Sequence, residues 1–174
     1  MSYFIRIIQA ISRFFGVVSA LLVSSAILVV CQMVVLRYFL NESTIWQTEY
    51  VTYAIVAATF LGSPYVLLIR GHVNVNLLPH YLSGGPKKAL ALIASLLALV
   101  FCAVLTWQAF NFFFEAYDGG WVTDTIWELP LWIAFLPMFV GMLLLSLQYV
   151  ADILGVAFNY QEPFAAPENL VEAE

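Results

Sequence analysis

Long uninterrupted stretches of apolar residues alternate with short charged segments along the 174-residue chain. Four stretches contain no Asp, Glu, Lys or Arg, and they span residues 14–36, 50–69, 89–114 and 129–151. They are 23, 20, 26 and 23 residues long. Because an α-helix rises about 1.5 Å per residue, about 20 residues cross a hydrocarbon core of about 30 Å. The pattern therefore predicts an all-α integral membrane protein with four transmembrane helices.

The segments outside these stretches predict smaller elements within one membrane domain over residues 1–160. Residues 1–13 carry apolar side chains at helical spacing beside two arginines, which predicts a short amphipathic helix at the membrane interface. A similar stripe in the second connection, over residues 73–82, predicts another short interfacial helix. Residues 161–174 are rich in Glu and Pro and predict a flexible acidic tail.

Composition agrees with lipid as the solvent for most of the chain. Hydrophobic residues make up 63% of the sequence and charged residues 10%, whereas soluble domains have about 25% charged residues. A secretory signal peptide would also begin with arginines followed by an apolar stretch, but its apolar core has only about 7–15 residues. The first stretch has 23, which favours a transmembrane helix.

The positive charges predict how the helices are oriented. Five of the six cations lie in the N-terminal segment and the second connection: Arg6, Arg13, Arg70, Lys87 and Lys88. Arg37 is the sixth and lies in the first connection. Because Lys and Arg in short loops remain on the cytoplasmic side, both termini are expected to be cytoplasmic. Arg13, Lys87 and Lys88 flank predicted helices and are expected to contact lipid headgroups.

The third connection is acidic and contains two tryptophans, although the whole chain has a net charge of only −5. The predicted topology puts this connection on the outer side of the membrane. Its carboxylates match the spacing of no calcium-binding loop. We therefore expect an acidic rim that could dock a partner, formed by Glu115, Asp118, Trp121, Asp124, Trp127 and Glu128.

Residue types that would support catalysis are missing from the four apolar stretches. The two histidines, His72 and His80, both lie in the second connection, so no pair is placed to ligate a haem iron. Cys31 and Cys102 lie in separate helices without the paired spacing of a redox or metal site. We predict no catalytic, cofactor-binding or metal-binding residue, no enzymatic activity and no nucleic-acid partner. A four-helix membrane redox protein and a small oligomeric exporter are the alternatives.

Several short motifs lie at the predicted helix boundaries. Arg37-Tyr38-Phe39 ends the first helix, and Trp46-Gln47-Thr48-Glu49 begins the second, which contains Gly62. Arg70-Gly71-His72-Val73-Asn74-Val75 follows it, and Pro130-Leu131-Trp132 opens the fourth. Together these motifs resemble the small membrane subunit of tripartite ATP-independent periplasmic (TRAP) transporters, the DctQ family, over residues 5–156. Thr48 and Asn76 depart from the acidic residues common in that family.

The resemblance implies a scaffold subunit in the bacterial inner membrane rather than a carrier in its own right. It implies a large membrane subunit that imports an organic acid with sodium, and a periplasmic protein that captures the acid.

Two groups of residues are expected to shape the ends of the second helix. Arg37, Trp46 and Glu49 are expected to brace the outer hairpin, with Arg37 and Glu49 either paired or separately exposed to the headgroups. Arg70, Gly71 and His72 are expected to form the cytoplasmic exit of the helix: a cation at the phosphates, a flexible turn and a local hydrogen bond.

Overall fold

The computed structural model describes residues 2–69, 85–125 and 127–158. Its helices are α1 (Ser2–Val35), which continues into the π-helix η1 (Leu36–Leu40), followed by α2 (Ile45–Leu68), α4 (Gly85–Asp118) and α5 (Leu131–Ala157). Each of the four α-helices is long and apolar enough to cross a membrane. The four predicted helices are confirmed, and each extends beyond its uncharged stretch at one end or at both.

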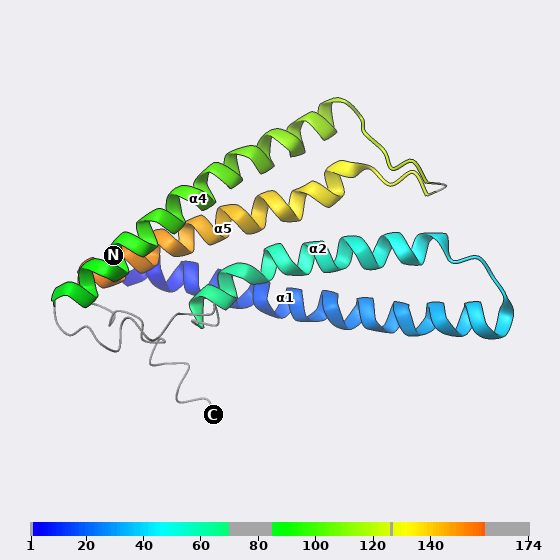
Figure 1. Cartoon of the computed structure of the whole chain (residues 1–174), viewed down its shortest axis with the longest axis horizontal. Coiled ribbons are helices and arrows are strands. Elements are labelled where there is room, and N and C mark those ends of the chain that lie inside the picture. The colour runs from blue at the N-terminus through cyan, green and yellow to red at the C-terminus, as the bar shows by residue number, and fades with distance from the viewer. Residues whose placement is uncertain (1, 70–84, 126, 159–174) are drawn as a thin grey trace.

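The helices lie side by side in one row, in the order α1, α2, α5, α4 (Figure 1). Extensive contacts join neighbours in this row, and a smaller contact joins α1 with α5. In the described part of the chain, the outer helices α1 and α4 make no substantial contact with each other. A closed four-helix bundle would pack these helices together as well. The fold is therefore an open row with two broad faces.

The two ends of the row differ. At one end, the terminal end, α1 begins beside the last turns of α5 (Figure 1). At the other, the loop end, lie the connection 41–44 and the described residues of the third connection, 119–125 and 127–130 (Figure 1). The hairpin of α1 and α2 and the hairpin of α4 and α5 approach each other at the terminal end and diverge toward the loop end (Figure 1).

Small residues bring α1 and α2 close together. A methyl group on Gly16 would lie 2.5 Å from the ring of Tyr65, and one on Gly62 would lie 2.7 Å from the hydroxyl of Ser19. The Ser19 hydroxyl also donates a hydrogen bond of 2.7 Å to the carbonyl oxygen of Ala58. Such close approach between helices is typical of membrane proteins, where packing and hydrogen bonds replace the hydrophobic effect.

The other hairpin is attached to the first through α5. A core cluster joins three helices and consists of Leu67, Cys102, Met142 and Leu145. Close to it, Gly141 of α5 lies against the backbone of Phe60 in α2. On the side of α5 that faces α4, the hydroxyl of Ser146 forms a hydrogen bond of 3.1 Å with the hydroxyl of Thr106 in α4. Hence α5 is the element that joins the two hairpins.

At the terminal end, the start of α1 packs on the end of α5. Ile5 and Ile8 form a buried cluster with Ala151. One turn further along α1, the hydroxyl of Ser12 donates a hydrogen bond of 3.0 Å to the side-chain oxygen of Gln148. Ser12 and Gln148 are 0% and 4% exposed, so this polar pair is shielded from lipid and satisfied within the chain.

Residues 2–13 are the first turns of α1 and not a separate short helix. The helix continues because no proline interrupts its hydrogen bonding between Ser2 and Val35. Their placement at the membrane interface stays a prediction. The helix expected over residues 73–82 and the tail expected over residues 161–174 lie outside the described residues.

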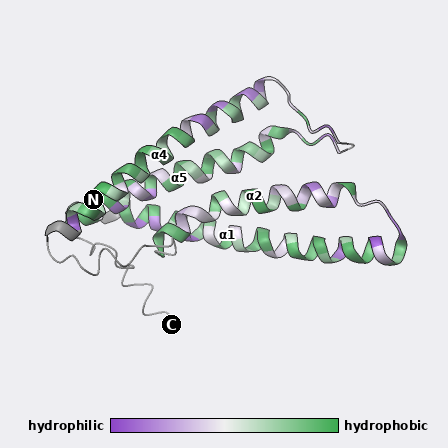
Figure 2. Cartoon of the chain, viewed as in Figure 1, coloured by the Kyte–Doolittle hydropathy of each residue, from purple (hydrophilic) through white to green (hydrophobic). Residues whose placement is uncertain are grey.

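Hydrophobic residues make up most of the outer helices α1 and α4 (Figure 2), and many of their large apolar side chains are exposed. Leu28 on α1 and Leu97 on α4, for example, are 71% and 67% exposed. In water, such continuous apolar surface would cause aggregation. It suits a lipid environment or contact with the helices of another membrane protein.

Candidate functional site

The turn between α1 and α2 is closed by Arg37. Asn41 ends η1 in the left-handed conformation, with φ of 51°, and its N–H bonds back to Leu36. The Nε of Arg37 then donates a hydrogen bond of 2.6 Å to the hydroxyl of Thr44, the residue before α2. That hydroxyl makes no cap hydrogen bond to a backbone N–H of α2. Arg37 is thus hydrogen-bonded to the residue before α2, and its role as a brace stays a prediction.

Glu49, the expected partner of Arg37, has no such bond. Both oxygens of its carboxylate are buried and have no hydrogen-bond partner in the described structure. The side-chain oxygen of Gln47, a residue that is 3% exposed, also lacks a partner. A buried acceptor without a donor costs about 1–3 kcal/mol, and more when it is charged. The first turns of α2 therefore carry three acceptor oxygens that this part of the chain leaves unsatisfied.

Trp46, the third residue of the expected brace, reaches across to the other hairpin. Its ring meets that of Trp127 edge to face, with centroids 6.4 Å apart. Such a pair contributes about 0.5–1.5 kcal/mol beyond the area it buries. One residue of the expected brace therefore contacts one residue of the expected docking rim, and the pair joins the two hairpins at the loop end.

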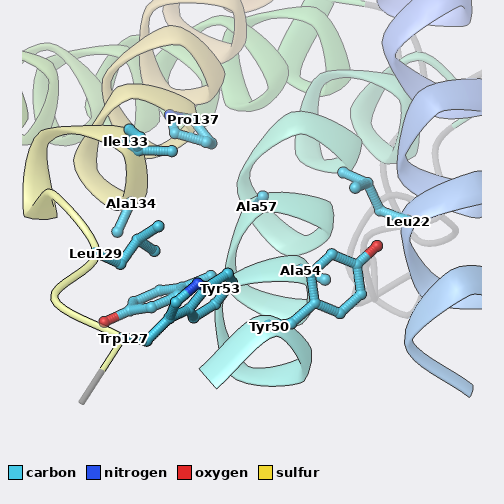
Figure 3. A pocket seen from close by; sticks show the side chains of 10 residues that line it. All are labelled: Leu22, Tyr50, Tyr53, Ala54, Ala57, Trp127, Leu129, Ile133, Ala134 and Pro137. Carbon is cyan, nitrogen blue, oxygen red and sulfur yellow. The ribbon is translucent and has the colours of Figure 1, made fainter. Parts of the chain in front are cut away.

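An apolar cavity of about 240 Å³ lies between the hairpins beside this tryptophan pair (Figure 3). It is lined by Leu22, Tyr50, Tyr53, Ala54, Ala57, Trp127, Leu129, Ile133, Ala134 and Pro137. The hydroxyl of Tyr50 is engaged with Ser25 of α1 at 2.8 Å. The described residues of the lining include no carboxylate, histidine or thiol, and apart from the two tyrosines and Trp127 they are aliphatic, so this cavity mainly offers contact to apolar groups.

The third connection is a folded turn. Val122 and Pro130 form an isolated antiparallel bridge, and Leu131 N–H donates to the carbonyl oxygen of Trp121 at 2.9 Å. Glu128 adopts a φ of 43°, an uncommon conformation for a residue with a side chain. The six residues expected to form a docking rim are all exposed at the loop end: Glu115, Asp118, Trp121, Asp124, Trp127 and Glu128. Their role in docking a partner stays a prediction.

The cations of the terminal end have different environments. The Nζ of Lys88 donates a hydrogen bond of 3.2 Å to the carbonyl oxygen of Ala157, at the end of α5. Arg13 is half-buried, and its Nε is buried without a hydrogen-bond partner. The side chain of Lys87 and the motif of Arg70, Gly71 and His72 lie outside what the structure describes.

Groups that could support other chemistry are dispersed in the described ranges. Cys31 is exposed on α1 and Cys102 is buried on α4, both as free thiols. No group of three or more His, Cys, Asp or Glu side chains in residues 2–69, 85–125 and 127–158 could hold a metal ion.

Two features of the structure were not found by sequence reasoning. The pair of Ser12 and Gln148 is one of them, although Ser12 shares a helical face with Ile5 and Ile8 and could have been assigned to the interior. The other is the pairing of Trp46 with Trp127, for which the sequence carries no local signal.

The comparison with protein families gives a match over most of the chain. The family described as "Tripartite ATP-independent periplasmic transporters, DctQ component" matches residues 26–159. These residues include α2, α4, α5 and the brace residues Arg37, Trp46 and Glu49. A comparison with curated proteins gives no match. The resemblance carried by the helix-boundary motifs is confirmed, and the chain belongs to the DctQ family, the small membrane component of TRAP transporters.

Proposed function

We propose that this chain is the non-catalytic scaffold subunit of a sodium-driven TRAP transporter for organic acids. In this proposal both termini are cytoplasmic, the membrane is the bacterial inner membrane, and the helices widen the fixed frame of a large membrane subunit. The observation that carries the proposal is the open row of helices, in which α1 and α4 are outermost and do not close against each other. A row of this kind offers a broad apolar face to a partner, which a closed bundle would bury internally.

The unpartnered oxygens of Gln47 and Glu49 support a protein contact at the loop end of α2. These oxygens are buried by the chain's own atoms, and a buried acceptor without a donor is costly. A rearrangement of the first turns of α2 on contact with the large subunit, in which Arg, Lys, Ser or Asn side chains of that subunit donate to both residues, would therefore stabilise the complex. We assign part of the contact with the large subunit to these first turns of α2.

Co-purification tests this contact. The chain and the large membrane subunit encoded with it are co-expressed, the chain carries the affinity tag, and the recovered large subunit is quantified. Glu49→Gln removes the charge that needs a donor, and we expect recovery to fall about tenfold, the factor that corresponds to about 1.4 kcal/mol. Glu42→Gln is the matched control, because Glu42 is exposed in the adjacent turn. Wild-type recovery with Glu49→Gln, together with a monodisperse chain when expressed alone, would contradict the scaffold role.

Docking of the periplasmic binding protein is assigned to the third connection. Its four exposed carboxylates, Glu115, Asp118, Asp124 and Glu128, form an acidic rim that could meet a basic surface. Replacing all four with Lys should abolish uptake into proteoliposomes that contain both membrane subunits and the binding protein. The same variant should still co-purify with the large subunit. Unchanged uptake would remove the docking role and leave the scaffold role intact.

A further inference from the structure

A hollow of about 480 Å³ lies on the first turns of α1 and is lined by Arg6, Gln9, Ala10 and Arg13. Gln9, Ala10 and Arg13 follow Arg6 by three, four and seven positions, so all four residues share one face of the helix. The two arginines stand at the ends of the hollow, separated by seven residues or about 10 Å along the axis. Ala10 lies between them, and its small side chain leaves the space open.

The arginine at the inner end of the hollow, Arg13, makes no hydrogen bond through its Nε, which is buried by the chain itself. The terminal N–H groups of its guanidinium are the donors left for a ligand. A guanidinium presents several N–H groups in a planar fork that matches the oxygens of a phosphate. Among the described residues that line the hollow, two are cations and none is acidic, so an anion is favoured there.

The length of α1 puts this hollow at the depth of lipid phosphates. Arg13 and Arg37 are 24 residues apart, which corresponds to about 36 Å along a helix. A bilayer with its headgroup layers is about 40–45 Å thick. When Arg37 lies in one headgroup layer, Arg13 therefore lies in the other, and Arg6 lies about 10 Å further from the hydrocarbon core, where its long side chain can extend back toward the phosphates.

We propose that Arg6, Gln9 and Arg13 form a binding site for the phosphate of an anionic phospholipid, of the phosphatidylglycerol class, in the leaflet at the terminal end. The two guanidinium groups donate hydrogen bonds to the phosphate oxygens from opposite sides. The side-chain amide of Gln9 donates a further bond from the floor of the hollow. This site is distinct from the scaffold contact and requires no partner protein.

Native mass spectrometry tests the site on the full-length chain, extracted with any membrane protein that stays bound to it. Phosphatidylglycerol, phosphatidylethanolamine and inorganic phosphate are titrated separately. The wild type should retain phosphatidylglycerol at least about tenfold more tightly than phosphatidylethanolamine, since charge-assisted hydrogen bonds of this kind correspond to one or more powers of ten.

Two variants separate a built site from general attraction of cations to the membrane. Ala10→Leu fills the hollow and leaves every charge in place, and the pair Arg6→Gln with Arg13→Gln removes the donors. Both should lose the preference for phosphatidylglycerol. Ala20→Leu makes the same change at another exposed position of α1 and should retain the preference.

Three results would overturn the proposal. The first is full retention of phosphatidylglycerol by Ala10→Leu and by the double arginine variant. The second is binding of inorganic phosphate as tight as that of phosphatidylglycerol, which would identify a free anion as the ligand. The third is binding that develops only after removal of residues 159–174, which would identify the acidic tail of the chain as the occupant.

Discussion

Replacing Gly141 with Leu tests the contact that holds the two hairpins together. The first side-chain carbon at this position would lie 2.5 Å from the carbonyl carbon of Phe60 and closer still to its oxygen. These atoms belong to the backbone of α2 and cannot rotate away as the end of a side chain can. The helices α2 and α5 would have to separate, which would loosen the cluster containing Leu67 and Met142.

The magnitude follows from two opposing effects. Overpacking of a close contact costs about 1–3 kcal/mol for added methylene groups, and sometimes more. Replacing Gly by Leu within a helix stabilises the folded state by about 1 kcal/mol, because Leu has the higher helix propensity. Because Leu adds four carbons and no rotamer moves the first of them, we take the upper end of the overpacking cost and expect a net destabilisation of about 2 kcal/mol. For a chain of this length, each kcal/mol corresponds to about 2–4 °C, so the Tm should fall by about 4–8 °C.

The Tm is measured by heating the detergent-solubilised chain to a series of temperatures. Size-exclusion chromatography with fluorescence detection then gives the fraction that is still folded at each temperature. Ala20→Leu serves as the control because Ala20 is exposed on α1, where substitutions usually change stability by less than about 0.5 kcal/mol. A Tm for Gly141→Leu within about 2 °C of the wild type would refute the close approach of α2 and α5.

Three further predictions follow from individual contacts. Gln148→Leu should destabilise the chain by about 1 kcal/mol by leaving the Ser12 hydroxyl unpaired, and adding Ser12→Ala should recover most of this loss in the same thermal assay. Trp127→Ala should remove the edge-to-face contact with Trp46, which a lower Tm and a decreased yield of cysteine cross-links between the two hairpins would report. Arg37→Gln should loosen the start of α2, so amide hydrogen exchange over residues 41–48 should become faster while exchange at the terminal end stays unchanged.

The four helices could be predicted because charge is excluded from the hydrocarbon core, which leaves uncharged stretches in the sequence. The same reasoning underestimated α1, since it treated Arg13 as a boundary. An arginine near a helix end can extend its guanidinium group to the membrane interface while the backbone continues as a helix. The hydrogen bonding of α1 runs through Arg13 from Ser2 to Val35.

The environment of the candidate residues was harder to predict, because it depends on contacts between distant segments. Trp46 and Trp127 belong to different hairpins, and only the packing of α2 on α5 brings their rings together. The spacing of Arg37 and Glu49 allowed an ion pair at the hairpin mouth. In the structure the hydroxyl of Thr44 accepts from Arg37 instead, and the Glu49 carboxylate lacks a donor.

Satisfied and unsatisfied polar groups occupy different parts of the row, and this distribution bears on how the chain works. Along the helices, hydroxyl groups bond to carbonyl oxygens or to each other, as between Thr106 and Ser146. The unsatisfied buried atoms of the described residues belong to Arg13 at one end and to Gln47 and Glu49 toward the other. A buried group without a partner is costly, so a chain that acted alone would gain stability by replacing these side chains with apolar ones. We infer that the middle of the row is held by its own contacts and that its two ends are completed by others, a lipid phosphate at Arg13 and a protein donor at Glu49.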